Sequence, residues 1–293
     1  MFMRTLIARS AIVSSFLFGT SAAIAGDIDG VTVDSGKWSA AYVGLNAGYG
    51  WSDIGSAYDF GPANDLLVNG VGLAPNQNNH LNGYVVGGQV GFQHQFGRWV
   101  LGVEGTLDAT GMDDKSKSDW SFDNIGCGPG GRLCFGTAGD GIQTLDTRID
   151  NLFMVSGKIG YTFGDWMAYV RGGYAGANIT AHSNIAGDVT GCLLLCATAP
   201  VSTSASDNKR YDGWSIGGGV ERMIFPNLTV GVEYNYIDLG AETYSFNAPL
   251  TIGPATIPAS YQARIDPDAI QTVTFRLNFL LNGPAYAEAA PLK

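Results

Sequence analysis

Apolar and polar side chains alternate along eight segments of this chain, and each segment has roughly the length of a β-strand. In the first segment Val43 and Leu45 fall on one face, while Gly44 and Asn46 fall on the other. A period of two is the pattern of a strand that has one apolar face and one polar face. The predicted strands cover residues 40–51, 82–96, 99–111, 150–163, 166–179, 212–224, 228–239 and 269–281.

Two kinds of connection join these segments. Three are tight turns, at 96–99, 163–166 and 225–228. The other four are long, polar, Gly-rich segments without an evident period, at 52–81, 112–149, 180–211 and 240–268. Tight turns at one end and long loops at the other, over an even number of antiparallel strands, are typical of outer-membrane barrels. The sequence therefore predicts an all-β fold: an eight-stranded antiparallel transmembrane up-and-down β-barrel with four long extracellular loops. These loops are expected to be mobile unless disulfides brace them.

Composition and the positions of aromatic residues favour a membrane barrel over a soluble one. Charged residues make up 14% of the chain, well below the ~25% of an ordinary soluble domain. A soluble, lipocalin-like barrel would place its apolar side chains inside, but the charged side chains of this chain fall on the face opposite the aromatics. Aromatic residues gather at strand ends, as in the girdles of membrane barrels. These residues are Trp51, Phe96, Trp99, Phe163, Trp166, Trp214 and Tyr236.

The N-terminus has the pattern of a secretory signal peptide. Basic residues precede an apolar run at 11–18, and a small-x-small cleavage site follows at 23–25. The alternative is an uncleaved anchor, but the apolar run is too short to span a membrane comfortably. We expect a signal peptide at 1–25, a periplasmic segment at 26–37, the barrel at 38–281 and a periplasmic tail at 282–293.

Seven charged side chains have the parity of the barrel interior, and four are acidic while three are basic. They are Glu104, Asp108, Lys158, Arg171, Glu221, Glu233 and Arg276. The interior of an eight-stranded barrel is just wide enough for side chains to fill, and buried charges must pair. The seven residues therefore form either a salt-bridged plug or the lining of a narrow, water-filled path with a mild preference for cations.

The four cysteines occur as two close pairs in predicted loops, Cys127 with Cys134 and Cys192 with Cys196. In an exported protein this spacing favours two local disulfides. Metal binding is the alternative, but no His or second Cys pair lies at zinc spacing. The sequence contains no motif that predicts a catalytic site, a metal site or a cofactor. The formal net charge is −10 without a cluster of basic residues, which argues against a nucleic-acid partner.

Several segments resemble one family. The hairpin at 213–221, 226–230 and 233–240, the first strand at 38–50 and the last strand at 273–279 are similar to those of alphaproteobacterial small outer-membrane β-barrel proteins. Members of this family are often called immunogenic or porin-family surface proteins. The resemblance implies an eight-stranded barrel that is abundant at the cell surface, and members have been assigned envelope-integrity, porin and haemin-binding roles. Such barrels usually end at an aromatic residue that the barrel assembly machinery reads, whereas here a tail follows Phe279.

These observations predict an integral outer-membrane protein with a structural role at the cell surface. The alternatives are a small porin for ions or small solutes, and a binder of haem or host ligands through its loops. Its expected partners are outer-membrane lipid, the assembly machinery and extracellular ligands of the loops. Side chains that could ligate haem are Tyr58, His80, His182, Tyr244 and Tyr261.

Overall fold

The structure is a computed structural model that describes residues 36–59, 76–127, 134–193, 195–247, 249–257 and 260–281. The expected signal peptide, most of the N-terminal segment and the tail at 282–293 lie outside the described residues. No helix in the described part of the chain is long and apolar enough to cross a membrane.

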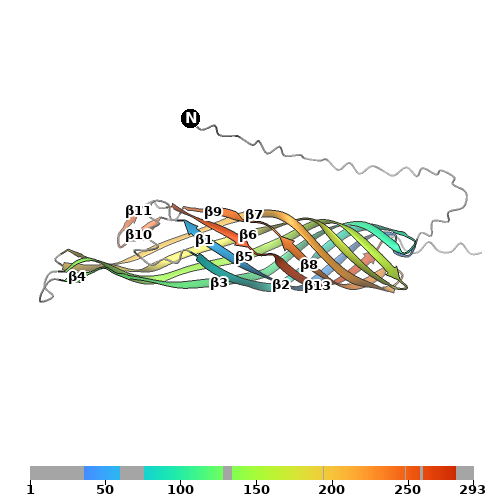
Figure 1. Cartoon of the computed structure of the whole chain (residues 1–293), viewed down its shortest axis with the longest axis horizontal. Helices are drawn as coiled ribbons and strands as arrows, with labels where there is room; N and C mark the ends of the chain where they lie inside the picture. The colour runs from blue at the N-terminus through green and yellow to red at the C-terminus, as the bar shows by residue number, and fades with distance from the viewer. Residues whose placement is uncertain are drawn as a thin grey trace, which may run out of the picture. The chain divides into compact units, whose positions relative to one another are not determined.

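Eight antiparallel strands close into a ring (Figure 1). The ring closes because β13 pairs with β1 on one side and with β8 on the other. This arrangement confirms the predicted fold. In ring order the strands are β1 (Ala40–Asp59), β2 (Asn76–Phe96), β3 (Trp99–Asp123), β5 (Cys134–Phe163), β6 (Trp166–Leu193), β7 (Leu195–Phe225), β8 (Leu228–Asp238) and β13 (Ile270–Leu280).

The three predicted tight turns all join neighbouring strands at one end of the ring. Phe96 pairs with Trp99 and Phe163 pairs with Trp166, so each of these turns contains two residues. Both turns begin with a glycine at positive φ, 62° at Gly97 and 68° at Gly164. Two-residue hairpin turns need this backbone conformation to match the strand twist, and glycine adopts it without steric cost.

The outer surface of the ring carries a band of exposed apolar side chains between two aromatic belts. The belt beside the tight turns contains Phe96, Trp99, Tyr161, Phe163, Trp166 and Phe225. The belt at the other end of the apolar segments contains Tyr49, Trp51, Tyr84, Tyr174, Trp214 and Tyr234. An apolar band between aromatic girdles is how a barrel meets the hydrocarbon and the two interfaces of a membrane.

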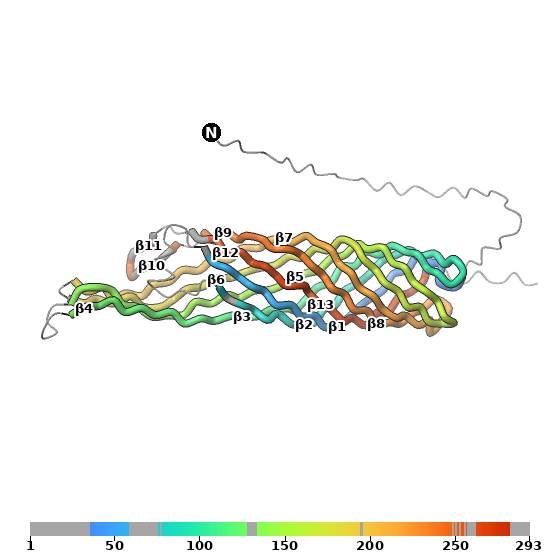
Figure 2. The backbone as a smooth tube through the Cα atoms, in the orientation of Figure 1, coloured from blue at the N-terminus to red at the C-terminus, as the bar shows by residue number. Residues whose placement is uncertain are grey.

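The described parts of the four segments predicted as loops without a period are mostly β-strand, so the prediction that they lack regular structure was wrong. Strands β3, β5, β6 and β7 contain 25 to 31 residues each and run on beyond the second aromatic belt. In Figure 2 the long strands continue toward β4 at one end of the barrel. We call the described residues of 52–81, 112–149, 180–211 and 240–268 the extension. The extension also contains β4 (Gly126–Cys127), β9 (Glu242–Asn247), β10 (Leu250–Ile252), β11 (Ala255–Ile257) and β12 (Ser260–Pro267).

The extension has its own apolar core, which explains why its strands form away from a membrane. Met112, Leu145, Ile149 and Phe246 point inward and are at most 1% exposed, while polar side chains cover the outside. A strand whose apolar face points inward removes that face from water, which stabilises the strand outside a membrane. A prediction that rests on outward apolar faces misses strands of this kind, and their polar outer residues then resemble loops.

Candidate functional site

All seven predicted lumen charges lie inside the ring, and each is at most 3% exposed. Strand alternation produces this result, because each charge has the parity opposite to a lipid-facing neighbour such as Leu101 or Val170. The seven side chains come from six different strands. Glu104 and Asp108 lie on β3, Lys158 on β5, Arg171 on β6, Glu221 on β7, Glu233 on β8 and Arg276 on β13.

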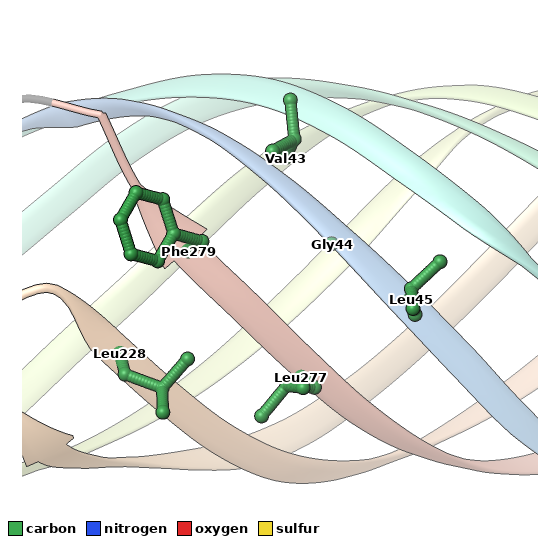
Figure 3. A pocket seen from close by; sticks show the side chains of 6 residues that line it. All are labelled: Val43, Gly44, Leu45, Leu228, Leu277 and Phe279. Atoms are coloured by element: carbon green, nitrogen blue, oxygen red, sulfur yellow. The ribbon is translucent and has the colours of Figure 1, made fainter.

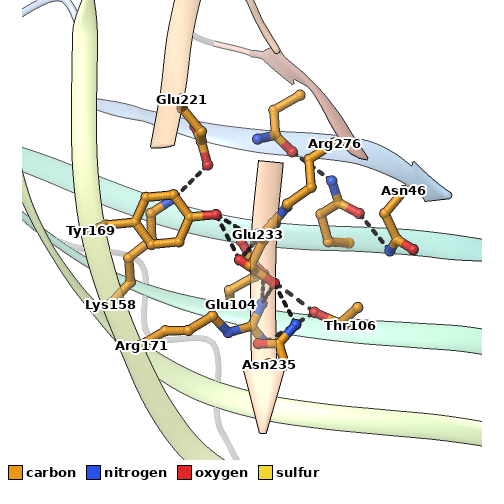
Figure 4. Close-up of polar contacts among 12 residues, drawn as sticks. Asn46, Glu104, Thr106, Lys158, Tyr169, Arg171, Glu221, Glu233, Asn235 and Arg276 are labelled. Carbon is orange, nitrogen blue, oxygen red and sulfur yellow. Dashed lines mark hydrogen bonds and ion pairs between the residues drawn. The ribbon is translucent and has the colours of Figure 1, made fainter. Parts of the chain in front are cut away.

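Four of these residues form a closed set of ion pairs across the lumen (Figure 4), which we call the charge ring. Arg171 Nη1 lies 2.5 Å from Glu104 Oε1 and 3.0 Å from Glu233 Oε1. Arg276 Nη2 lies 2.6 Å from Glu104 Oε2, and Arg276 Nη1 contacts Glu233 Oε2. Each guanidinium therefore bridges both carboxylates, and each carboxylate is shared by both guanidiniums.

Neutral side chains donate further hydrogen bonds to the two carboxylates of the charge ring. The hydroxyl of Tyr42 donates to Glu104 Oε2, and the hydroxyl of Tyr169 donates to Glu233 Oε2, each at 2.6 Å. Asn235 Nδ2 donates to Glu233 Oε1 at 2.9 Å. A buried ion pair is tolerated only when its remaining lone pairs also find donors, and these three side chains supply them.

Lys158 and Glu221 form a second buried pair beside the charge ring. Lys158 Nζ lies 3.1 Å from Glu221 Oε1. The same ammonium lies 4.4 Å from the ring centroid of Tyr169 and 5.2 Å from that of Tyr42. Contact with aromatic faces stabilises a desolvated cation, so the two tyrosines support both groups of charges.

Asp108 belongs to neither group. Among the described residues no Lys, Arg or His lies within ion-pair distance of its carboxylate. Asn46 Nδ2 donates a hydrogen bond to Asp108 Oδ1 at 2.8 Å. The same amide nitrogen also donates to Gln89 Oε1 at 3.1 Å, and Gln89 Nε2 donates to Asn278 Oδ1 at 2.7 Å. Asp108 therefore ends a chain of amides.

Apolar side chains lie at both ends of this polar section. At the tight-turn end Trp38 is fully buried against Val100, Met167 and Tyr169. Its backbone N–H donates to Gln95 Oε1 at 3.2 Å. At the other end the apolar core of the extension begins. Trp38 was not among the predicted site residues, although its even number gives it the inward parity of Gly44 and Asn46.

The two disulfides join the predicted partners, Cys127 to Cys134 and Cys192 to Cys196. Both lie at the far tip of the extension, where Gly136 of β5 pairs with Cys192 of β6. Each bridge links two adjacent antiparallel strands, so it fixes the end of a hairpin. This position removes the cysteines from any contact with the lumen charges.

Of the four described side chains considered for haem, two are buried and two are exposed, and the two tyrosines lie on the strands that flank β12 at Ala263. Tyr58 and Tyr244 are buried in the core of the extension, and the Tyr244 hydroxyl donates to the carbonyl of Ile179. His80 and His182 are exposed, and the side chain of Tyr261 lies outside the described residues. In the described segments no cluster of three or more His, Cys, Asp or Glu could hold a metal ion.

One of these histidines has a charged partner. His80 Nδ1 lies 2.6 Å from Asp53 Oδ1. The hydrogen bond to the Asp53 carboxylate and its negative charge raise the pKa of His80 above its usual value.

The outer surface of the ring contains an apolar groove of about 380 Å³ (Figure 3). Its lining residues come from β1, β8 and β13, and include Leu45, Leu228, Leu277 and Phe279. Because these side chains belong to the apolar band, the groove faces lipid and does not open into the lumen.

Comparison with known proteins agrees with this architecture. Residues 11–252 match the model of the outer membrane protein β-barrel domain family. The 31 kDa outer-membrane immunogenic protein of Brucella melitensis biotype 1 is 26% identical over 212 residues, covering 71% of this chain and 74% of the relative. The 22 kDa outer membrane protein of Rhizobium leguminosarum bv. viciae is 26% identical over 217 residues, covering 73% of this chain and 70% of the relative.

Solved structures of outer-membrane barrels match more weakly. The outer membrane protein OprG from Pseudomonas aeruginosa is 12% identical and covers 83% of this chain and 97% of its own, with a TM-score of 0.36. That likeness is too low to carry an argument about function. The family match, which covers more than half of the chain, shows that the chain belongs to the outer-membrane β-barrel domain family and is an outer-membrane protein.

Proposed function

We propose that this protein has a structural role at the bacterial surface, in which a closed barrel anchors a folded β-extension above the outer membrane. The observation that carries the proposal is the charge ring. Glu104 on β3 and Glu233 on β8 start from opposite sides of the eight-stranded ring, yet both are bound by Arg171 and by Arg276. Side chains that meet across a lumen leave no continuous aqueous path through it.

The apolar ends of the lumen support the same conclusion. Trp38 fills the tight-turn end and the core of the extension fills the other. Hydrated ions would have to pass two apolar constrictions and break buried ion pairs, and each step is costly. The buried carboxylates are equally inaccessible to a substrate, so we infer a non-catalytic role.

The extension supplies the surface function in this proposal. It is folded by an apolar core and its tips are fixed by disulfides, so it offers a defined surface to the exterior. The Brucella relative is named as an immunogenic protein, which fits a surface that is exposed outside the cell. The apolar band supports outer-membrane lipid as a partner, and the barrel assembly machinery would insert it. The tips of the extension are where we place any extracellular ligand.

A small porin is the second candidate, and the polar lining of the lumen favours it. Several buried polar atoms there have no partner among the described residues, including Arg171 Nε and Asn235 Oδ1. Such atoms are usually satisfied by ordered water. Water bound in isolated places does not make a pore, but a continuous file of water would.

Single-channel recording in a planar bilayer tests the two candidates. The refolded protein should give no reproducible conductance steps, while a general diffusion porin in the same bilayer serves as the positive control. Heat-shifted migration on a gel shows that the silent protein is folded. Discrete, reproducible steps from the folded protein would overturn the structural proposal in favour of a porin. In that case Arg171→Ala should change the ion selectivity, and the exposed matched variant Arg264→Ala should not.

A further inference from the structure

Asp108 leaves the lumen with one unpaired negative charge. Four carboxylates face three cationic side chains, and Lys158, Arg171 and Arg276 are all engaged by Glu104, Glu221 and Glu233. Asp108 is only 3% exposed. An isolated carboxylate in such a place costs several kcal/mol unless a compensating charge lies beside it. No side chain of the described residues supplies that charge.

The surroundings of Asp108 offer further oxygen atoms. A Cβ atom on Gly87 would lie 2.1 Å from Asp108 Oδ1, so the carboxylate occupies space that only a glycine leaves open. Asn46, which is 5% exposed, donates to this carboxylate through Nδ2. The amide oxygen of Asn46 is buried, and no described side chain or backbone group donates a hydrogen bond to it. An anionic oxygen and an unsatisfied amide oxygen are thus present on neighbouring side chains.

We propose that Asp108 and Asn46 form the protein part of a binding site for one small monovalent cation of the Na⁺ type. Carboxylate and carbonyl oxygens are the donors that hard cations prefer, and buried water molecules would complete the coordination. One monovalent ion balances the single surplus charge, whereas a divalent ion would leave an excess positive charge. The charge ring and the Lys158–Glu221 pair remain intact, because the ion uses neither.

Cation-specific stability tests this site. The full-length protein is refolded at one pH in sodium chloride or in choline chloride at equal ionic strength, and its unfolding midpoint is measured by heat-shifted gel migration. A ligand that binds the folded state raises stability in proportion to the logarithm of its concentration. The midpoint of the wild type should therefore rise with sodium but not with choline. Asp108→Asn keeps the shape of the side chain and should abolish the difference, while the exposed control Asp188→Asn should retain it.

Three outcomes would overturn the proposal. Equal midpoints of the wild type in the two salts would mean that no specific cation is bound. A sodium response that survives Asp108→Asn would place the ion elsewhere. A midpoint that depends on pH but not on sodium would make a proton the compensating charge. If Asp108→Asn does not fold, sodium NMR on the wild type provides the readout, and the proposal requires a broadened sodium signal that potassium narrows by competition.

Discussion

The membrane-spanning ring and the extension share the same strands but have opposite polarity. On β3 the inward face carries Asp108 in the ring and Met112 in the extension. These two residues are only four positions apart on the same strand. On β1 the outward face carries Leu45 in the ring and Asp53 in the extension. The backbone pairing continues through both regions. The medium outside each region therefore decides which face is apolar, because lipid solvates an apolar outer face and water solvates a polar one.

The two interiors consequently rely on different interactions. The ring is held inside by charges and hydrogen bonds that have directions and must all be satisfied. The extension is held by apolar contacts that depend on volume and shape. Removing a single group should therefore have different consequences in the two regions, and substitutions that separate these consequences test the comparison.

Loss of a guanidinium from the charge ring should have the largest effect. Arg276→Leu leaves Glu104 and Glu233 to share Arg171 alone, and breaking a buried ion pair costs about 3–5 kcal/mol. The matched control is Arg264→Leu, whose side chain is 61% exposed and lies 3.7 Å from Asp266. An exposed pair contributes about 1 kcal/mol or less. Urea unfolding of the two variants measures the difference, and equal losses would contradict the account of the ring interior.

Truncation of a side chain in the core of the extension should cause the second-largest loss of stability. Leu145 is fully buried, and Leu→Ala changes in a core cost about 2–5 kcal/mol. The loss should be local, so that Leu145→Ala makes the extension sensitive to protease while the ring keeps its heat-shifted gel migration. Ile142→Ala, on the outer face of the same strand, is the control and should change little. If Leu145→Ala also unfolded the ring, the two regions would form one cooperative unit.

A Thr→Val substitution should change the stability of the protein in opposite directions in the two regions. Thr106 of the ring accepts a hydrogen bond from Arg171 Nη2 at 3.3 Å and donates one to Glu104. Thr106→Val should therefore destabilise the protein by about 1 kcal/mol. Thr147 of the extension is fully buried, and its hydroxyl has no hydrogen-bond partner in the part of the chain that the structure describes. Thr147→Val should therefore be neutral or stabilising by a similar amount. Paired urea titrations measure the sign, and destabilisation by both changes would show that the extension core depends on polar contacts too.

The strands of the ring and the seven lumen charges could be predicted from the sequence because alternation in lipid is strict. Parity alone places Glu104 on the other face of its strand from Leu101, and Arg171 on the other face of its strand from Val170. Parity gives the face of a residue but not its height in the barrel, which depends on the tilt and register of the strands. The contacts of Arg171 with Glu104 and Glu233 therefore could not be predicted, and neither could the isolation of Asp108.

The extension was missed for a physical reason. At residues 115–122 the alternation of charged residues with Ser116, Ser118, Trp120 and Phe122 is a strand pattern whose apolar face is weak and points inward. A search for outward apolar faces does not detect it. The parity also changes within β5, where the register shifts between Ile149 and Asn151. A bulge of this kind moves one extra residue into a strand, and no simple period-two reading extends across it.

The smallest predicted effect concerns the outer surface of the extension, where charges are solvated. The Asp53 carboxylate accepts a hydrogen bond from His80 and raises the pKa of its imidazole. A raised pKa in the folded state means that the pair stabilises the protein below the unfolded pKa of about 6.5, and that this contribution is lost as the pH rises through the folded value. NMR titration of His80 should show its pKa falling in Asp53→Asn but not in the distant control Asp212→Asn. Added salt should also shrink the shift, because the pair is exposed and screened, whereas the buried charge ring should be insensitive to salt. A His80 titration that ignores both Asp53→Asn and salt would mean that the outer charges of the extension do not act through solvated pairs.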